Sequence, residues 1–168
     1  MSDKLPAWIE IGGNIPREHV PALIECIRSS GVAGSFGSGD IVVRSAADLL
    51  DLARDATGKL GTLKLYDERA RNGEFRALEC FLEENGIGFD RRSDGAAEFS
   101  PEIVRFRPGW PAPTTGIRDN LGREVVPIEY VEEAMEILRA GKIDETIAHL
   151  AAFVGEEVPA LTPLEILA

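Results

Sequence analysis

The sequence predicts a mixed α/β (α+β) protein with a ferredoxin-like core, in which an antiparallel sheet carries two helices on one face. Two observations favour this two-layer sandwich. Residues 61–89 follow a strand–helix–strand pattern, and a similar pattern begins at residue 7. The two helical segments also match at an offset of 55 residues, and each ends at a glycine, Gly31 or Gly86. This match is explained either by an internal duplication or by the pattern that any two amphipathic helices share.

The first βαβ-type unit spans residues 7–43. Residues 7–12 alternate in polarity, which predicts a strand. Asn14 is suited to cap the following helix and Pro16 to occupy its first turn, although Pro21 also allows a later start. Residues 41–43 are a short apolar run after a glycine-rich segment, and they predict the second strand.

The second unit follows an inserted helix. Ser45 and Asp48 have capping-box spacing and predict this insertion. Alternation at 63–65 then predicts a strand, and Asn72 is suited to cap the next helix. A further strand begins at Ile87. Asp94-Gly95 is a two-residue hairpin signal, which returns the chain through Ala97, Phe99, Val104 and Phe106.

The composition changes at Pro108, so we divide the chain into a core, residues 1–109, and an extension, residues 110–168. The extension begins with a proline-rich loop, and residues 124–127 predict a short edge strand. Two helices follow, over 128–140 and 143–154. The last segment, VPALTPLEILA, is apolar. We expect the extension to pack on the core, and this last segment to pack there or on a second copy in a homodimer.

The charge is negative and uneven. The net charge is −11, and residues 110–168, with 11 acids and 4 bases, contribute −7 of it. This balance argues against direct contact with nucleic acid and favours a basic protein surface as partner. No apolar run reaches the roughly 20 residues that span a membrane, the start lacks a signal-peptide pattern, and the two cysteines lie apart in helical patterns. These features predict a cytoplasmic protein with no membrane partner.

Four glutamates form an acidic stripe on the first helix of the extension. Spacings of zero, three, four and seven residues place them on one helix face, opposite an apolar stripe. A solvated helix face and a docking surface for a basic partner both account for this pattern. The candidate partner-binding residues are Glu129, Glu132, Glu133 and Glu136.

Four arginines on the predicted hairpin offer an alternative site. Guanidinium groups bind phosphate or carboxylate with two hydrogen bonds, so the hairpin is a candidate anion-binding or catalytic region. Acidic residues nearby, including Asp90 and Glu102, provide internal partners, and cross-strand ion pairing is the competing interpretation. The candidate ligand-binding residues are Arg91, Arg92, Arg105 and Arg107.

Enzymatic chemistry has no other candidate. The two histidines, His19 and His149, lie far apart, and no cysteine accompanies them at metal-ligand spacing. No GxSxG segment is present to position a nucleophile. We therefore predict no metal site, no cofactor and no catalytic residue.

Three segments within residues 7–109 carry a resemblance: WIEIGG, GEFRALECFLEENGIGFDRRSDG and VRFRPG. In these segments the chain is similar to small uncharacterised proteins of bacterial plasmids and prophages. The resemblance implies no activity, cofactor or site residue. It implies a context, because small acidic proteins of mobile elements often inhibit host defence complexes by occupying their nucleic-acid-binding surfaces. The resulting hypothesis is a non-enzymatic interaction protein, in its most specific form an anti-CRISPR-like inhibitor.

Overall fold

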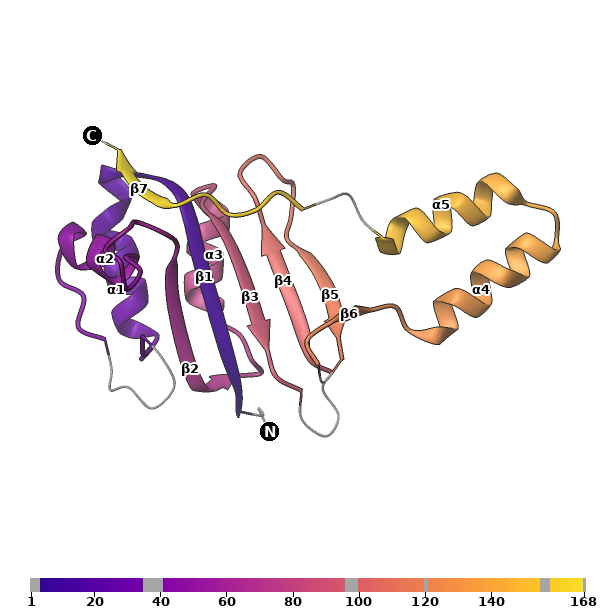
Figure 1. Cartoon of the computed structure of the whole chain (residues 1–168), viewed down its shortest axis with the longest axis horizontal. Helices are drawn as coiled ribbons and strands as arrows, with labels where there is room; N and C mark the ends of the chain where they lie inside the picture. The colour runs from indigo at the N-terminus through magenta and orange to yellow at the C-terminus, as the bar shows by residue number, and fades with distance from the viewer. Residues whose placement is uncertain (1–3, 35–40, 96–99, 120, 155–157, 168) are drawn as a thin grey trace.

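The computed structural model describes residues 4–34, 41–95, 100–119, 121–154 and 158–167. In these residues the protein is mixed α/β, as the sequence predicts, with five α-helices and a seven-stranded sheet (Figure 1). The elements in chain order are β1 (Lys4–Pro16), a 3-10 turn (Arg17–His19), α1 (Val20–Ser29), α2 (Ala46–Leu52), β2 (Leu63–Arg71), α3 (Arg76–Glu84), β3 (Gly88–Ser93), β4 (Glu102–Phe106), β5 (Thr114–Arg118), β6 (Glu124–Val125), α4 (Ile128–Arg139), α5 (Ile143–Val154) and β7 (Leu164–Leu167).

Six strands form an antiparallel sheet in the order β2-β1-β3-β4-β5-β6, and β7 adds to β1 in parallel. Both β2 and β3 pair antiparallel with β1, so they run parallel to each other on either side of it. The segment β2–α3–β3 is therefore a βαβ unit with β1 between its strands. The strand–helix–strand pattern predicted at 61–89 is present in this form.

The first predicted βαβ unit does not form. Residues 41–43 carry no strand, and β1 is followed in the sheet by its antiparallel neighbour β2. Ala33, and not residues 41–43, pairs with the free edge of β2, through an isolated bridge to Tyr66. Ile41 donates its backbone N–H to the carbonyl of Val32, and Val43 is buried in the core. Of this run, Val43 is buried, Ile41 is partly buried and Val42 is 63% exposed, so only part of its apolar character reflects burial, and none of it reflects a place in the sheet.

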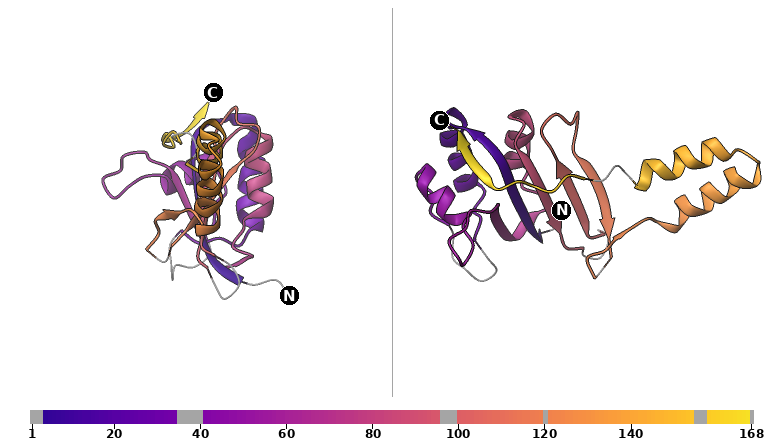
Figure 2. Two further views of the ribbon diagram at one scale, coloured as in Figure 1. Left: turned by 90° about the vertical axis from the view of Figure 1, so that its right-hand side faces the viewer. Right: turned by 45° about the horizontal axis from the view of Figure 1, so that its top comes forward.

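The two helices α1 and α3 lie side by side on one face of the sheet (Figure 2). Alternate residues of the strands point toward them and form the core, as the period of two requires. The opposite face is not covered by α1 or α3 and bears the alternate side chains, many of them charged. We call it the open face. The largest fully buried side chains include Phe89, Ile9, Ile11, Leu23, Leu63, Leu65 and Leu78.

The helix starts differ from the sequence predictions in two places. Strand β1 continues to Pro16, and Asn14 pairs with Glu165 of β7, so α1 begins only at Val20 with Pro21 in its first turn. Asn72 caps no helix: it lies in a tight turn at φ 55°, next to Gly73. The capping box of Ser45 and Asp48 is confirmed.

Strands β3 and β4 pair antiparallel, as predicted, but their connection is longer than a two-residue turn. The last pair of residues in the ladder is Ser93 and Glu102. Of the positions predicted for the returning strand, Val104 and Phe106 are in β4 and buried. Ala97 and Phe99 lie outside the described residues.

The extension, which we expect to pack on the core, contains both strands that join the sheet and two helices that project from it. Its helices α4 and α5 pack against each other and project beyond the β6 edge of the sheet (Figure 1). The other described parts of the extension belong to the body: β5 and β6 continue the sheet from β4, and the final segment returns after the helices, where β7 pairs with β1 and Leu164 is fully buried. No described helix has the length and apolar character needed to cross a membrane.

Candidate functional site

The first candidate site is the pair of antiparallel helices α4 and α5, which we call the helical hairpin. Gly141 ends α4 at φ +77°, a conformation that favours glycine, and allows the chain to reverse. Ala134 and Thr146 are buried between the two helices, and the ring Nε2 of His149 lies 3.3 Å from the carbonyl oxygen of Tyr130. Small residues at this contact let the two helices approach closely.

All four stripe glutamates are exposed on α4. Glu133 has one ion-pair partner, His149, whose Nε2 lies 3.7 Å from the Glu133 carboxylate and pairs with it when the imidazole is protonated. Glu129, Glu132 and Glu136 make no ion pair with any described residue. The stripe is therefore a row of solvated carboxylates, unmatched by bases on the same helix.

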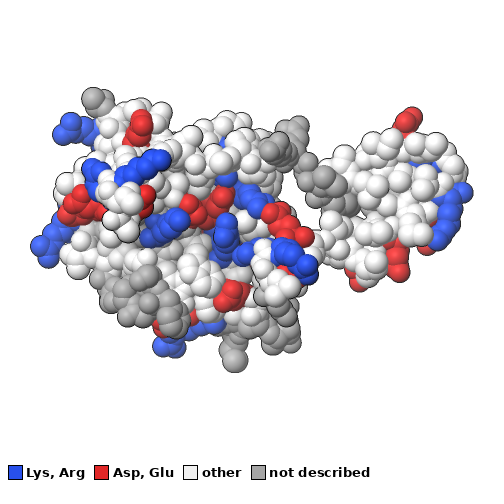
Figure 3. Space-filling model, in the orientation of Figure 1, with Lys and Arg blue, Asp and Glu red and all other residues white. Residues whose placement is uncertain are grey.

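The hairpin also exposes apolar side chains. Figure 3 shows that the side turned to the viewer is largely uncharged, with charged groups along its edges. Such a side is unusual for a helix pair in water, because it leaves apolar area unburied. The exposed apolar residues are Ile128, Tyr130, Val131, Met135 and Leu138 on α4, and Ile143, Ile147 and Leu150 on α5.

The second candidate site, the four arginines, is divided by the sheet. Arg91 points toward the helices and is buried, with a side chain 4% exposed. Its Nε lies 3.1 Å from the Glu79 carboxylate of α3, its guanidinium lies 2.6 Å from Glu102, and it donates to the Gly73 carbonyl at 2.8 Å. Arg91 therefore ties α3 to the sheet and has no access to solvent for a ligand.

Glu79 completes this buried network. Its carboxylate also accepts the backbone N–H of Phe75 at 2.7 Å, in place of a side-chain cap from the turn. Burial raises the pKa of Glu79, while Arg91 and the Phe75 N–H oppose that shift by favouring the charged form. The turn before α3 is compact, because a Cβ on Gly73 would lie 2.6 Å from the Cβ of Ser93.

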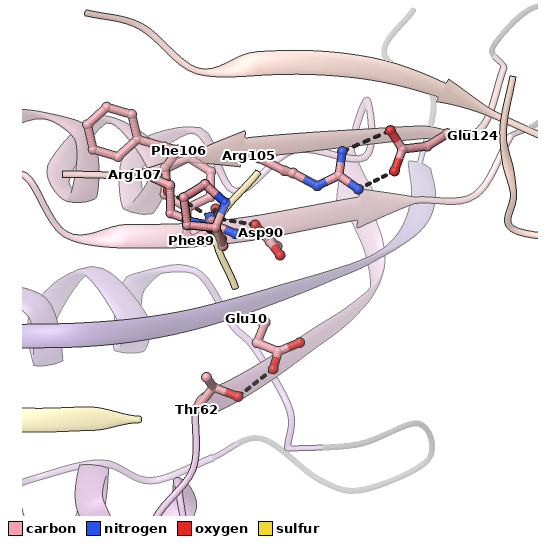
Figure 4. Close-up of polar contacts among 9 residues, drawn as sticks. Glu10, Thr62, Phe89, Asp90, Arg105, Phe106, Arg107 and Glu124 are labelled. Carbon is pink, nitrogen blue, oxygen red and sulfur yellow. Dashed lines mark hydrogen bonds and ion pairs between the residues drawn. The ribbon is translucent and has the colours of Figure 1, made fainter. Parts of the chain in front are cut away.

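Arg105 and Arg107 lie on the open face, and both are engaged within the protein (Figure 4). Arg107 contacts the Asp90 carboxylate at 2.7 Å and donates to the carbonyls of Phe89 and Pro159. Arg105 forms a two-pronged pair with Glu124 of β6. Gly116 leaves room for that pair, since a Cβ there would lie 3.3 Å from the Glu124 carboxylate.

Replacing Glu124 by glutamine is expected to lower the free energy of unfolding by about 0.2–1 kcal/mol at neutral pH, the range of exposed ion pairs. The hydrogen bond from Arg105 lowers the pKa of Glu124, against the opposing effect of burial. A lowered pKa stabilises the fold above the ordinary value of 4.5, and this contribution is lost as the pH falls through the folded-state pKa.

Urea unfolding of the wild-type chain and Glu124→Gln, from neutral pH to well below 4.5, measures this difference. Glu136→Gln makes the same chemical change where no arginine pairs with the carboxylate. A Glu124→Gln difference that persists unchanged at the acid end would contradict the assignment.

Arg92 is the one member of the set whose guanidinium makes no hydrogen bond or ion pair with a described residue. It is exposed on the open face, directly opposite Trp8 in the β1–β3 ladder. The predicted ligand-binding set contains both Arg92 and its neighbour Arg91, although strand alternation places the two on opposite faces. Trp8 belongs to the strand predicted at residues 7–12, but its pairing with Arg92 depends on a strand register that no local signal predicts.

No family model, curated protein or solved structure matches the chain. Within the described residues no group of three or more His, Cys, Asp or Glu side chains is arranged to hold a metal ion. Cys26 is half-buried and Cys80 exposed, both as free thiols. The two candidate functional surfaces of the described residues are the helical hairpin and the open face.

Proposed function

We propose that this chain is a non-enzymatic interaction protein that docks its helical hairpin on a basic surface of a partner protein. The projection of the hairpin carries this proposal: two helices extend beyond the sheet with an acidic row and an exposed apolar side (Figures 1 and 3). The α/β core, as a variant of the ferredoxin-like arrangement with β1 inside a βαβ unit, serves as the scaffold that presents it.

The charge of the hairpin favours a basic partner. Residues 128–154 hold six acids, Glu129, Glu132, Glu133, Glu136, Asp144 and Glu145, and two bases, Arg139 and Lys142, which gives a balance of −4. A surface that normally binds nucleic acid presents lysines and arginines in rows, and it would attract this hairpin. In its most specific form the proposal is an anti-CRISPR-like inhibitor from a mobile element, acting in the cytoplasm without contacting nucleic acid itself or a membrane.

The apolar side of the hairpin supplies the other part of an interface. Specific protein interfaces have an apolar centre and a polar rim, and the centre contributes most of the affinity. On the hairpin, Ile143 and Ile147 are each 61% exposed and lie on one face of α5. The glutamates of α4 would then give orientation and fast association, and the apolar side chains would give a long-lived complex.

Reversing the charge of Glu129, Glu132, Glu133 and Glu136 to lysine is expected to abolish capture of the partner from the native host. The matched control reverses four exposed acids of the core, Glu18, Glu25, Asp51 and Glu84, which changes the net charge by the same amount. Quantitative affinity purification compares the variants. Because the attraction is electrostatic, binding of the wild-type chain should weaken with salt, and nucleic acid should compete with it.

Two outcomes would overturn this proposal. If the control variant loses the partner as completely as the hairpin variant, net charge rather than the stripe is responsible. If light scattering shows a dimer that Ile147→Lys converts to monomer, a second copy of this chain covers the apolar side instead of a basic partner.

A further inference from the structure

The open face contains a groove that the proposed function does not use. It has a volume of about 800 Å³, within the roughly 300–1,000 Å³ range of small-molecule sites. Strands β2, β1 and β3 form its floor, and its rim includes Gly34 on one side and the turn after β5 on the other. Figure 3 shows charged side chains gathered on this face of the sheet.

One part of the groove is aromatic. Trp8 and Tyr66 are opposite each other in the β1–β2 ladder, and their ring centroids are 5.1 Å apart at an interplanar angle of 39°. Both side chains line the groove, but Tyr66 is buried, whereas Trp8 is 39% exposed. A partly exposed indole, supported from one side by a buried phenol ring, offers a flat surface on which another ring can stack.

Next to this surface lies an available positive charge. Arg92 is the cross-strand neighbour of Trp8 on the side away from Tyr66, so the sheet orders Tyr66, Trp8 and Arg92 in one row. Neighbours directly opposite in a ladder have Cβ atoms about 4.5–5.5 Å apart, so a ligand on the indole comes within reach of the Arg92 guanidinium.

The acids of the groove do not neutralise Arg92. Glu10 lies 3.8 Å from Lys64, Asp90 lies 2.7 Å from Arg107, and Asp119 lies 2.7 Å from Arg123. The remaining lining acid is Asp94, and the lining also contains Arg118, whose Nε donates to the Gly122 carbonyl. The lining holds four acids and three bases, but three of the acids are engaged by Lys64, Arg107 and Arg123. Glu124, just outside the lining, attracts Arg92 and Arg118 but forms its direct ion pair with Arg105, so the Arg92 guanidinium keeps its hydrogen-bond donors available.

We propose that this groove binds a small ligand in which a flat ring carries an anionic group, a phosphate or a carboxylate. The ring stacks on Trp8, and the anionic group pairs with Arg92, for which a guanidinium offers two parallel hydrogen bonds. This site is independent of the helical hairpin. It also replaces the four-arginine hypothesis with a site that contains only one of those arginines, because the other three are engaged within the protein.

The test is calorimetric titration of the full chain with adenosine monophosphate and with benzoate, which separate phosphate from carboxylate as the preferred anion. Adenosine and inorganic phosphate are the partial ligands. We expect one of the two complete ligands to bind with a Kd between about 10 μM and 1 mM, and both partial ligands to bind at least tenfold more weakly. Trp8→Leu and Arg92→Gln should each weaken binding at least tenfold.

Arg71→Gln is the matched control. Arg71 is exposed on β2 and lines a second cavity, of about 460 Å³, away from the groove. Its replacement should leave Kd within about twofold of the wild-type value, and circular dichroism checks that all three variants are folded. The proposal is wrong if neither ligand binds at concentrations up to about 5 mM. It is also wrong if Arg92→Gln binds as well as the wild-type chain, or if Arg71→Gln is the variant that loses binding.

Discussion

Replacing Glu79 by alanine is expected to lower the free energy of unfolding by about 3–5 kcal/mol, the usual effect of removing one partner of a buried ion pair. The variant leaves the Arg91 guanidinium buried without its contact to α3, and it leaves the Phe75 N–H without its acceptor. Glu102 remains beside Arg91, but its side chain is 32% exposed and it belongs to β4. Guanidinium chloride unfolding, followed by circular dichroism at neutral pH, measures the loss.

A double variant separates the ion pair from simple packing. Glu79→Leu combined with Arg91→Met replaces both charges by apolar groups of similar length, a change that is often neutral or stabilising for buried pairs. We expect this double variant to be more stable than either single replacement. A loss below about 1 kcal/mol for Glu79→Ala, or a double variant less stable than both singles, would show that the network contributes little.

The elements governed by local signals could be predicted from the sequence. The Ser45–Asp48 capping box, the helix stops at glycine and the period of the apolar residues all depend on near neighbours in the chain. Local signals do not determine the structure of residues 41–43. A short apolar run is equally compatible with an extended buried segment and with a strand, and only the occupation of the β2 edge by Ala33 decides between them.

The candidate site could be predicted only in part. The spacing of the four glutamates places them on one helix face, and the structure shows that they are exposed there. What spacing does not predict is the position of the hairpin relative to the sheet, because that depends on long-range packing. The arginines show the same limit, since Arg91 and Arg92 are adjacent in sequence, yet one is buried against α3 and the other faces solvent.

Replacing Leu164 by alanine is expected to lower the free energy of unfolding by about 2–5 kcal/mol, the range for leucine truncations in a packed core. Leu164 is 0% exposed and belongs to the main core cluster, although it lies only four residues from the C-terminus. Its backbone N–H also donates to the Gly61 carbonyl at 2.8 Å. The last segment of the chain is thus part of the α/β core in space, and thermal or chemical unfolding measures its contribution.

A replacement in β1 tests the same contact between the final segment and the core. Gly12 of β1 lies against the final segment so closely that an added Cβ would be 2.3 Å from the Thr162 carbonyl oxygen. Gly12→Ala should therefore displace this segment and destabilise the protein by about 1–3 kcal/mol, as overpacking does. The control for Leu164→Ala is Leu167→Ala, which removes the same side chain at an exposed position and so opens no cavity.

The attachment of the final segment to the core also restricts the position of the helical hairpin. The chain enters α4 from β6 at one edge of the sheet and, after α5, returns to the body through Pro159, whose carbonyl accepts from Arg107, and through β7. Attachment at both ends restricts how far the hairpin can turn relative to the sheet. Leu164→Ala should loosen one attachment, so hydrogen exchange should rise in β7 and in β1 at residues 13–16 before the helices themselves change. Uniform exchange across β7 and the helices in this variant would show that the final segment does not act as a separate anchor.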